Sequence, residues 1–419
     1  MKICLVTSFP PSKERLNEYG YHLARELQER RGLSVTVLAD QYAREEVLEL
    51  PGFEVLRCWR FNDLLTPFKL IRALKKIKPD VVWFNLVFSS FGDRPIPAFI
   101  GLLTPVLVRL CGWYSHVTLH HLMESLDLTK ATKFARFYQF AGYLATKLLL
   151  GSNSVSVLLP SYRSTLLQKY KAQNIHLRRH GVFSSNPIPP DYTKRGNPEH
   201  RILAFGKWGT YKRLELLIEA FTQVAEKIPN AKLVIAGSNH PMTPGYVEAV
   251  RDRYKDSSRF EFHGYIPEEE VPGLFSLASV LVMPYTSAGG PSGVAHQACE
   301  FALPIVSSDI PDFRDMADDS GIAMEFFENG NADSLAETLI RFLQDPEKQL
   351  SMAEQNYGVA MQMSMREIIR QYLLSFTRWK HAKSLNRKRP AIFAKNQIEE
   401  YGKFGIREMV LDACTTREK

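Results

Sequence analysis

The chain has 419 residues, of which 45% are hydrophobic and 23% charged, and it carries a formal net charge of +8. This length exceeds one ordinary hydrophobic core, and the apolar share excludes an intrinsically disordered protein, so we expect two globular domains. The five cysteines lack paired spacing and the N-terminal apolar run is too short for a signal peptide, which favours a cytoplasmic protein without disulfides or structural zinc.

Strand-like and helix-like segments alternate through the first half of the chain. An apolar run over residues 2–9 predicts a strand, and Gly20, Leu23 and Leu27 then recur at helical spacing. Five more strands are expected before residue 190, over residues 34–40, 53–58, 81–85, 115–119 and 154–159. Strands that alternate with helices predict a parallel sheet covered on both faces, so we expect a Rossmann-like domain over residues 1–183.

The longest apolar stretch covers residues 95–108 and stops at Arg109. It is shorter than the roughly 18 to 20 residues that a membrane-spanning helix needs. It fits a core helix better than a helix that docks on a membrane.

A proline-rich polar segment over residues 184–200 has the composition of a linker, and the alternation restarts after it. Strands over residues 201–206, 231–237, 260–265, 279–285 and 304–309 predict a second Rossmann-like domain, residues 201–360. We expect a helix over residues 361–377 to return to the first domain, ahead of a basic extension over 378–419. Ligands bind beyond the carboxyl ends of the strands in such sheets, so the cleft between the domains is the expected active site.

Two features at strand ends of the second half suit an anion. Lys207 and Lys212 follow a strand that ends at Gly206, and two cations there can hold a diphosphate, although they are also compatible with solvated surface lysines. Further on, a helix expected to start at Ser292 or Gly293 leaves its first amides unpaired.

The turn before that helix is rich in glycine. Gly289, Gly290 and Gly293 lack a Cβ, so a phosphate can approach the backbone, although any tight turn uses such residues. Together, the lysine pair and the helix start favour a diphosphate-containing ligand.

The segments that carry these features resemble a known family. FGKWGTYKRLELLIEAF, AKLVIAGS, FHGYIPEEEVPGLFSLASVLVMPY and EFALPIVSSDIPDFRDM resemble the nucleotide-sugar-binding domain of the retaining family-four, or group 1, glycosyltransferases with the GT-B fold. IKPDVVWFN, VTLHHL and RRHGV agree more loosely with the first domain of that family. The resemblance implies an α/β GT-B fold, two Rossmann-like doubly wound domains facing each other across a cleft.

The resemblance also implies a hexosyltransferase that moves a sugar from a nucleotide-sugar donor to a hydroxyl acceptor with retention. The acceptor would be a sugar, a lipid-linked sugar or a small molecule, in polysaccharide, glycolipid or glycoconjugate biosynthesis. No cofactor and no metal are expected, because lysines and helix amides neutralise the leaving diphosphate. A nucleotide-sugar epimerase of the same shape and a non-catalytic nucleotide-sugar-binding protein are the alternatives.

Site residues follow from the resemblance position by position. Lys207 and Lys212 would hold the donor diphosphate, with lysine at the first place where the family often has arginine. His120 would lie near the transferred sugar, although a structural histidine fits as well. Tyr265 would lie in the loop that runs beside the nucleobase, although a buried core tyrosine fits equally.

The family's pair of glutamates, which has seven residues between its members, is missing. Gly289 and Gln297 stand in those places, so we expect the amides of Ser292, Gly293 and Val294 to hold the donor and Gln297 to face the ribose. Glu300, three residues beyond Gln297, is the alternative ribose ligand; otherwise it is expected to be solvated or paired with a cation.

The first loop lacks the glycine-rich turn that is common in the family. Lys13, Arg15, Asn17 and Glu18 there would meet the acceptor or the donor phosphate, with Gly20 opening the following helix. Of these, the expected acceptor-binding residues are Asn17, Glu18 and Gly20. An ordinary polar loop is the alternative.

The C-terminal extension is the most basic part of the chain, with eleven Lys/Arg against five Asp/Glu over residues 378–419. Its composition is compatible with a nucleic-acid contact, an anionic membrane contact or a solvated tail. We expect no nucleic-acid partner, and a peripheral contact with the inner face of the membrane is the partner that the charge favours.

Overall fold

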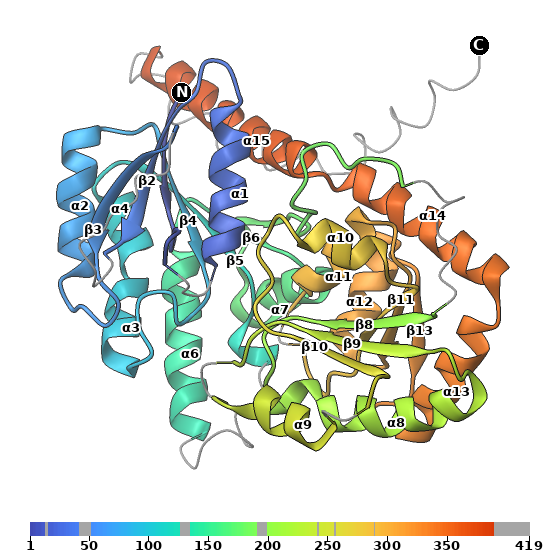
Figure 1. The fold of residues 1–419 in the computed structure, drawn as a ribbon. Helices are drawn as coiled ribbons and strands as arrows, with labels where there is room; N and C mark the ends of the chain where they lie inside the picture. Colours follow the sequence, from blue (N-terminus) through green and yellow to red (C-terminus); the bar gives the residue numbers. More distant parts are fainter. Residues whose placement is uncertain are drawn as a thin grey trace, which may run out of the picture. The chain divides into compact units, whose positions relative to one another are not determined.

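The computed structural model describes residues 1–12, 16–41, 52–125, 135–190, 199–240, 243–254, 257–288 and 290–388. The chain divides into two units, Met1–Arg370 and Gln371–Lys419. The larger unit contains two parallel sheets (Figure 1). The described part of the smaller unit, residues 371–388, is the continuation of helix α15 (Met365–Lys388).

The first sheet has seven parallel strands in the order β3-β2-β1-β4-β5-β6-β7. Its central strands are buried on both faces, as expected for a parallel sheet between helices. Figure 1 shows α1 and α2 on opposite sides of this sheet. The strands are β1 (Lys2–Val6), β2 (Ser34–Asp40), β3 (Glu54–Trp59), β4 (Val81–Leu86), β5 (Tyr114–Leu119), β6 (Ser154–Val157) and β7 (Ile175–Leu177).

The second sheet has six parallel strands in the order β10-β9-β8-β11-β12-β13. The strand order reverses between β8 and β11, as it does between β1 and β4 in the first sheet, and ligands bind at such switch points. The strands are β8 (Arg201–Phe205), β9 (Lys232–Ala236), β10 (Phe260–His263), β11 (Val280–Met283), β12 (Ile305–Ser308) and β13 (Met324–Phe327).

Helices connect the strands in both halves. In the first half they are α1 (Asn17–Gln28), α2 (Thr66–Ile77), α3 (Pro95–Leu102), α4 (Thr104–Leu110), α6 (Ala135–Leu150) and α7 (Pro160–Tyr170). In the second they are α8 (Leu214–Lys227), α9 (Tyr246–Tyr254), α10 (Val271–Ser276), α11 (Gly293–Glu300), α12 (Pro311–Ser320), α13 (Ala332–Leu343) and α14 (Pro346–Gln362).

The doubly wound α/β architecture predicted from the sequence is confirmed, with differences in detail. One strand in each sheet, β7 and β13, was not predicted; both are edge strands that are only partly buried, so they lack the continuous apolar run of the central strands. The apolar stretch over 95–108 forms two short helices with Pro105 opening the second, rather than one. The helix expected over 361–377 begins at Met365. Within the described residues, no helix is both long and apolar enough to cross a bilayer.

Candidate active site

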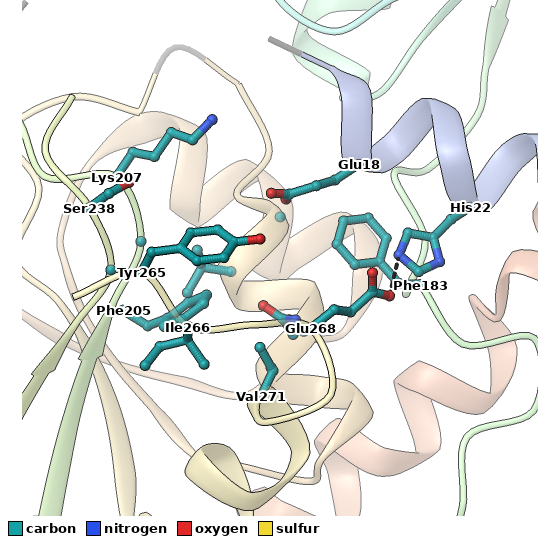
Figure 2. A pocket seen from close by; sticks show the side chains of 15 residues that line it. Glu18, His22, Phe183, Phe205, Lys207, Ser238, Tyr265, Ile266, Glu268 and Val271 are labelled. Atoms are coloured by element: carbon teal, nitrogen blue, oxygen red, sulfur yellow. Dashed lines mark ion pairs between the residues drawn. The ribbon is translucent and has the colours of Figure 1, made fainter. Parts of the chain in front are cut away.

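A pocket of about 330 Å³ lies at the carboxyl ends of β8, β9 and β10, beside the start of α11. Phe205, Gly206 and Lys207 follow β8, and Gly237 and Ser238 follow β9. The loop after β10 and helix α11 form the next walls, and α1 of the first half closes the remaining side (Figure 2). The pocket is therefore built from both halves of the larger unit.

Two glycines form the floor of this pocket by a close backbone approach. Gly206 has φ +135° and Gly237 has φ +112°, and a Cβ on Gly237 would lie 1.9 Å from the Gly206 carbonyl oxygen. Only glycine combines these backbone angles with this contact. The loops after β8 and β9 thus pack directly against each other and leave room above them.

Lys212 lies behind the floor, at the end of a 3-10 turn (Thr210–Lys212), with only 7% of its surface exposed. Its Nζ lies 4.6 Å from the centroid of the Tyr285 ring, and none of the described carboxylates pairs with it. Burial lowers the pKa of Lys212. A buried cation that lies over aromatic rings and has no carboxylate partner among the described residues is suited to bind an anion.

Lys207 differs from Lys212 although both follow the same strand. Lys207 lines the pocket, and Figure 2 shows its side chain extending away from Tyr265. Of the two lysines predicted as a pair, one is therefore exposed at the pocket and the other buried below it.

Helix α11 begins at Gly293, within the predicted start at Ser292 or Gly293, and Ser292 is its N-cap. The Ser292 hydroxyl accepts a hydrogen bond from the Ala295 amide at 3.3 Å, which satisfies one amide of the first turn. Gly293 and Val294 line the pocket, so the positive end of the helix dipole faces it.

Gly290 brings the turn before α11 against the first half. Its φ is +138°, its amide donates to Asp312 Oδ2 at 2.9 Å, and a Cβ there would lie 2.8 Å from the His120 carbonyl oxygen. Gly290 and Ser292 do not line the pocket itself. Gly289, the first residue of the predicted turn, lies outside the described residues, as do Lys13 and Arg15.

His120 follows β5 and is 7% exposed. Its Nε2 lies 2.7 Å from Asn85 Oδ1, so Nε2 carries the proton and donates to this amide oxygen. Burial, with further contributions from His180 and His121, holds the pKa of His120 well below 6.5. His120 is thus a neutral imidazole with its tautomer set by Asn85.

A cluster of histidines that was not predicted from the sequence surrounds His120. His180 lies 5.9 Å from His120 and 4.8 Å from His296, measured between ring centroids, and Tyr19 contacts both His120 and His180 at 4.7 Å. Burial lowers the pKa of His180 to about 4 and that of His296 to about 3. Single histidines in separate segments gave no common signal, so only the fold reveals this buried, neutral cluster.

Gln297 and Glu300 share helix α11 but have different surroundings. Gln297 lines the pocket. Glu300 Oε2 accepts from the Ser184 amide at 3.3 Å, and burial raises the pKa of its carboxyl group. The expectation that Glu300 is solvated is therefore wrong, because its carboxyl group is largely buried and accepts from the Ser184 amide, while the charge of Arg25 acts to lower its pKa.

Tyr265 and Glu18 enter the pocket from opposite sides (Figure 2). Tyr265 is 65% exposed, which rules out the alternative of a buried core tyrosine. Burial and the negative charge of Glu18 raise the pKa of the Tyr265 hydroxyl. Glu18 thus lines the same pocket as Lys207 and Gln297, which were predicted to bind the donor.

Asn17 and Gly20 do not line the pocket. Helix α1 already begins at Asn17, so Gly20 lies inside it rather than opening it. A Cβ on Gly20 would come within 2.7 Å of the Thr7 side chain, so this glycine allows α1 to pack on the end of β1.

An ion pair that the sequence did not indicate crosses the pocket. His22 Nε2 of α1 lies 3.1 Å from Glu268 Oε1 of the loop after β10, and the His22 ring stacks on Phe183 at 4.4 Å (Figure 2). His22, Glu268 and Phe183 all line the pocket. In the described part of the chain, no group of His, Cys, Asp and Glu side chains has the arrangement of a metal site.

Comparisons with known proteins place these features in a family context. Residues 191–359 match the family model described as Glycosyl transferases group 1. Mannosylfructose-phosphate synthase of Agrobacterium fabrum is 24% identical over 178 residues, which are 38% of this chain and 39% of that protein. The match thus spans about two fifths of this curated relative.

Solved structures agree with the fold over most of the chain. Sucrose-phosphate synthase from Thermosynechococcus elongatus superposes with a TM-score of 0.71 at 16% identity, over 91% of this chain and 100% of that chain. Anabaena Alr3699/HepE in complex with UDP-glucose gives 0.65 at 16% identity, over 90% and 100%. WaaG, a glycosyltransferase involved in lipopolysaccharide biosynthesis, gives 0.61 at 13% identity, over 90% and 100%.

Proposed function

We propose, from the match of residues 191–359 to the glycosyl transferases group 1 family model, that the chain moves a sugar from a nucleotide-sugar donor to a hydroxyl acceptor with retention. Both the family and the GT-B fold agree with the sequence analysis. The proposed acceptor is a sugar, a lipid-linked sugar or a small molecule, in polysaccharide, glycolipid or glycoconjugate biosynthesis. A nucleotide-sugar complex of a protein with the same fold supports this class of donor.

One observation carries the proposal: three anion-binding elements converge at Gly206. The position of a Cβ on Gly206 lies 2.6 Å from Lys212 Nζ and 3.6 Å from Val294 Cγ2, in the first turn of α11. A buried cation, a backbone without a side chain and a helix N-terminus thus meet at one point. A diphosphate over Gly206 would contact all three.

In the proposed reaction, negative charge develops on the diphosphate as the sugar departs. Lys212 and the amides of Gly293 and Val294 stabilise this charge in a partly dry site, where such donors act most strongly. Lys207, at the rim of the pocket, adds a second and more solvated cation. We propose that these groups perform the neutralisation without a metal ion.

We assign the transferred sugar to the side of His120. Because Nε2 of His120 donates to Asn85, its neutral Nδ1 is an acceptor for a sugar hydroxyl. Gly290, whose close contact with the His120 carbonyl joins the two halves, places the start of α11 near this histidine.

The nucleoside occupies the remaining pocket in this proposal. Tyr265 borders the base, and Gln297 faces the ribose in place of the family's glutamate. Glu18, which lines the same pocket from α1, supplies the carboxylate that α11 lacks. The acceptor contacts predicted for Asn17 and Gly20 stay predictions, since neither lines this pocket.

Nucleotide release from a panel of nucleotide sugars, with and without candidate acceptors, tests the proposed function. We expect acceptor-dependent release that survives a chelator, and a product with the donor's anomeric configuration by NMR. Release of an epimer or of free sugar alone would favour the epimerase. Binding without release from any donor would favour the non-catalytic protein.

A further inference from the structure

Large exposed apolar side chains lie at the starts of α2 and α3, and none of them lines the pocket. Leu64, Leu65, Phe68 and Ile96 are 53%, 59%, 66% and 69% exposed. We call these four residues the apolar corner. Single exposed apolar residues are ordinary on a protein surface, but a group of them marks an interaction site.

The apolar corner is one surface because Asn62 joins its two segments. The Asn62 side chain donates to Asp93 Oδ1 at 2.7 Å and accepts from the amides of Asp93 and Arg94 at 3.1 Å. Leu64 follows Asn62 by two residues, and Ile96 follows Arg94 by two. Helices α2 and α3 also contact each other directly.

Positive charge continues from the apolar corner along α2. This helix contains no acidic residue, and its exposed residues Phe68, Arg72, Lys75 and Lys76 recur at the spacing of one helical face. Residues 60–109 carry eight Lys/Arg against three Asp/Glu. One of the three acids, Asp63, is paired with Lys69 at 2.5 Å. We call Arg72, Lys75 and Lys76 the basic stripe.

We propose that the apolar corner and the basic stripe dock the protein on an anionic lipid bilayer. Exposed leucine and phenylalanine side chains next to lysine and arginine fit the acyl boundary and the anionic headgroups at once. An acidic protein surface would match the stripe but leave the apolar corner in water. The combination of exposed apolar and basic residues on this face therefore favours an anionic bilayer over an acidic protein.

The location of the apolar corner gives the docking a consequence. Helices α2 and α3 follow β3 and β4, so they start at the carboxyl edge of the first sheet, the edge at which α1 brings Glu18 to the pocket. A bilayer under the corner lies beside this edge. Acceptors held in the membrane would then be presented from that side.

Vesicle co-sedimentation without any sugar donor tests this proposal, so its outcome does not depend on the proposed function. The full chain is mixed with vesicles of phosphatidylcholine alone and of phosphatidylcholine with phosphatidylglycerol. We expect binding to the anionic vesicles only. Replacing the basic stripe (R72Q, K75Q and K76Q) weakens binding on the order of a hundredfold, because each cation near the surface contributes about 1 kcal/mol.

The apolar part is tested by F68S with I96S, and L277S with L350S is the matched control from exposed leucines of the second half. We expect weaker binding that remains salt-sensitive in the first pair, and unchanged binding in the control. Thermal unfolding of each variant verifies its fold. Hydrogen exchange of the unsubstituted chain gives a readout without any substitution, and we expect vesicles to slow exchange over residues 64–76.

Four outcomes would overturn the proposal. The first is no binding to anionic vesicles, and the second is equal binding to both vesicle types. In the third, deleting residues 389–419 abolishes binding while all corner and stripe variants bind normally, which would assign the membrane contact to the tail. In the fourth, the unsubstituted chain self-associates and F68S makes it monomeric, which would identify the corner as an interface between copies.

Discussion

The carboxyl ends of the two sheets have opposite character. Beyond the second sheet, Gly206 and Gly237 leave an open floor beside a buried lysine and the start of α11. Beyond the first sheet, His120 and its neighbours fill the space with neutral rings. One fold thus provides an edge suited to an anion and an edge with a cluster of neutral histidines, because the side chains that follow the strands differ between the two sheets.

The largest effect on turnover is expected when Lys212, the buried cation at the carboxyl edge of the second sheet, is replaced. Lys212→Met should reduce turnover by about 2.7 to 4 kcal/mol of transition-state stabilisation, which is on the order of a hundredfold to a thousandfold. Stability should not fall, because burial already disfavours the charged amine. Lys227→Met, in the exposed face of α8, is the control. Normal turnover in Lys212→Met, or a strongly lowered melting temperature, would contradict this comparison.

The neutral histidine cluster, to which the first half contributes His180 and helix α11 contributes His296, should be revealed by the pH dependence of stability. His180 and His296 have folded pKa values of about 4 and about 3, below the ordinary 6.5. The unfolded chain therefore binds protons below pH 6.5 that the folded chain does not, so acid lowers the free energy of unfolding. Each histidine contributes about 1.4 kcal/mol per pH unit from 6.5 down towards its folded pKa.

Urea unfolding at pH 6.5 and pH 5 measures this loss in the free energy of unfolding. Both pH values lie above the pKa of ordinary carboxyl groups, about 4. His296→Gln keeps a side-chain donor for the Ser292 carbonyl and should reduce the slope. Equal stability at the two pH values would mean that the cluster is hydrated and already protonated.

Within α11, the two polar residues should separate donor binding from folding. Gln297→Ala should weaken donor binding severalfold, by about 0.5 to 1.5 kcal/mol, because one hydrogen bond to the ribose is lost. Glu300→Ala should lower stability instead, since its carboxylate accepts from the Ser184 amide. Calorimetric titration of both variants with the nucleotide decides the assignment. Weaker binding only in Glu300→Ala would assign the ribose contact to Glu300 instead of Gln297.

The smallest effect is expected at the ion pair that crosses the pocket. Glu268 is 62% exposed, and such pairs contribute about 0 to 1 kcal/mol. Glu268→Gln should therefore change donor KM by less than about fivefold, and high salt should produce the same change in the unsubstituted enzyme. A larger loss that salt does not reproduce would show that Glu268 contacts the ligand itself.

The sequence by itself determined the elements whose signal is local. Apolar runs predicted strands such as β1 and β8, and the glycine-rich turn led to a predicted start of α11 at Ser292 or Gly293. These features depend on hydrogen bonds and side-chain periodicity within a few residues, which the order of amino acids specifies directly.

Only the tertiary structure decided what the same residue types do in different places. Lys207 and Lys212 stand five positions apart in one loop, yet the 3-10 turn buries the second under Tyr285 and leaves the first at the pocket. Glu18 and His22 enter that pocket from α1, and His180 and His296 join His120 from distant segments. Burial and charge environment depend on packing between elements far apart in the chain, so no local pattern encodes them.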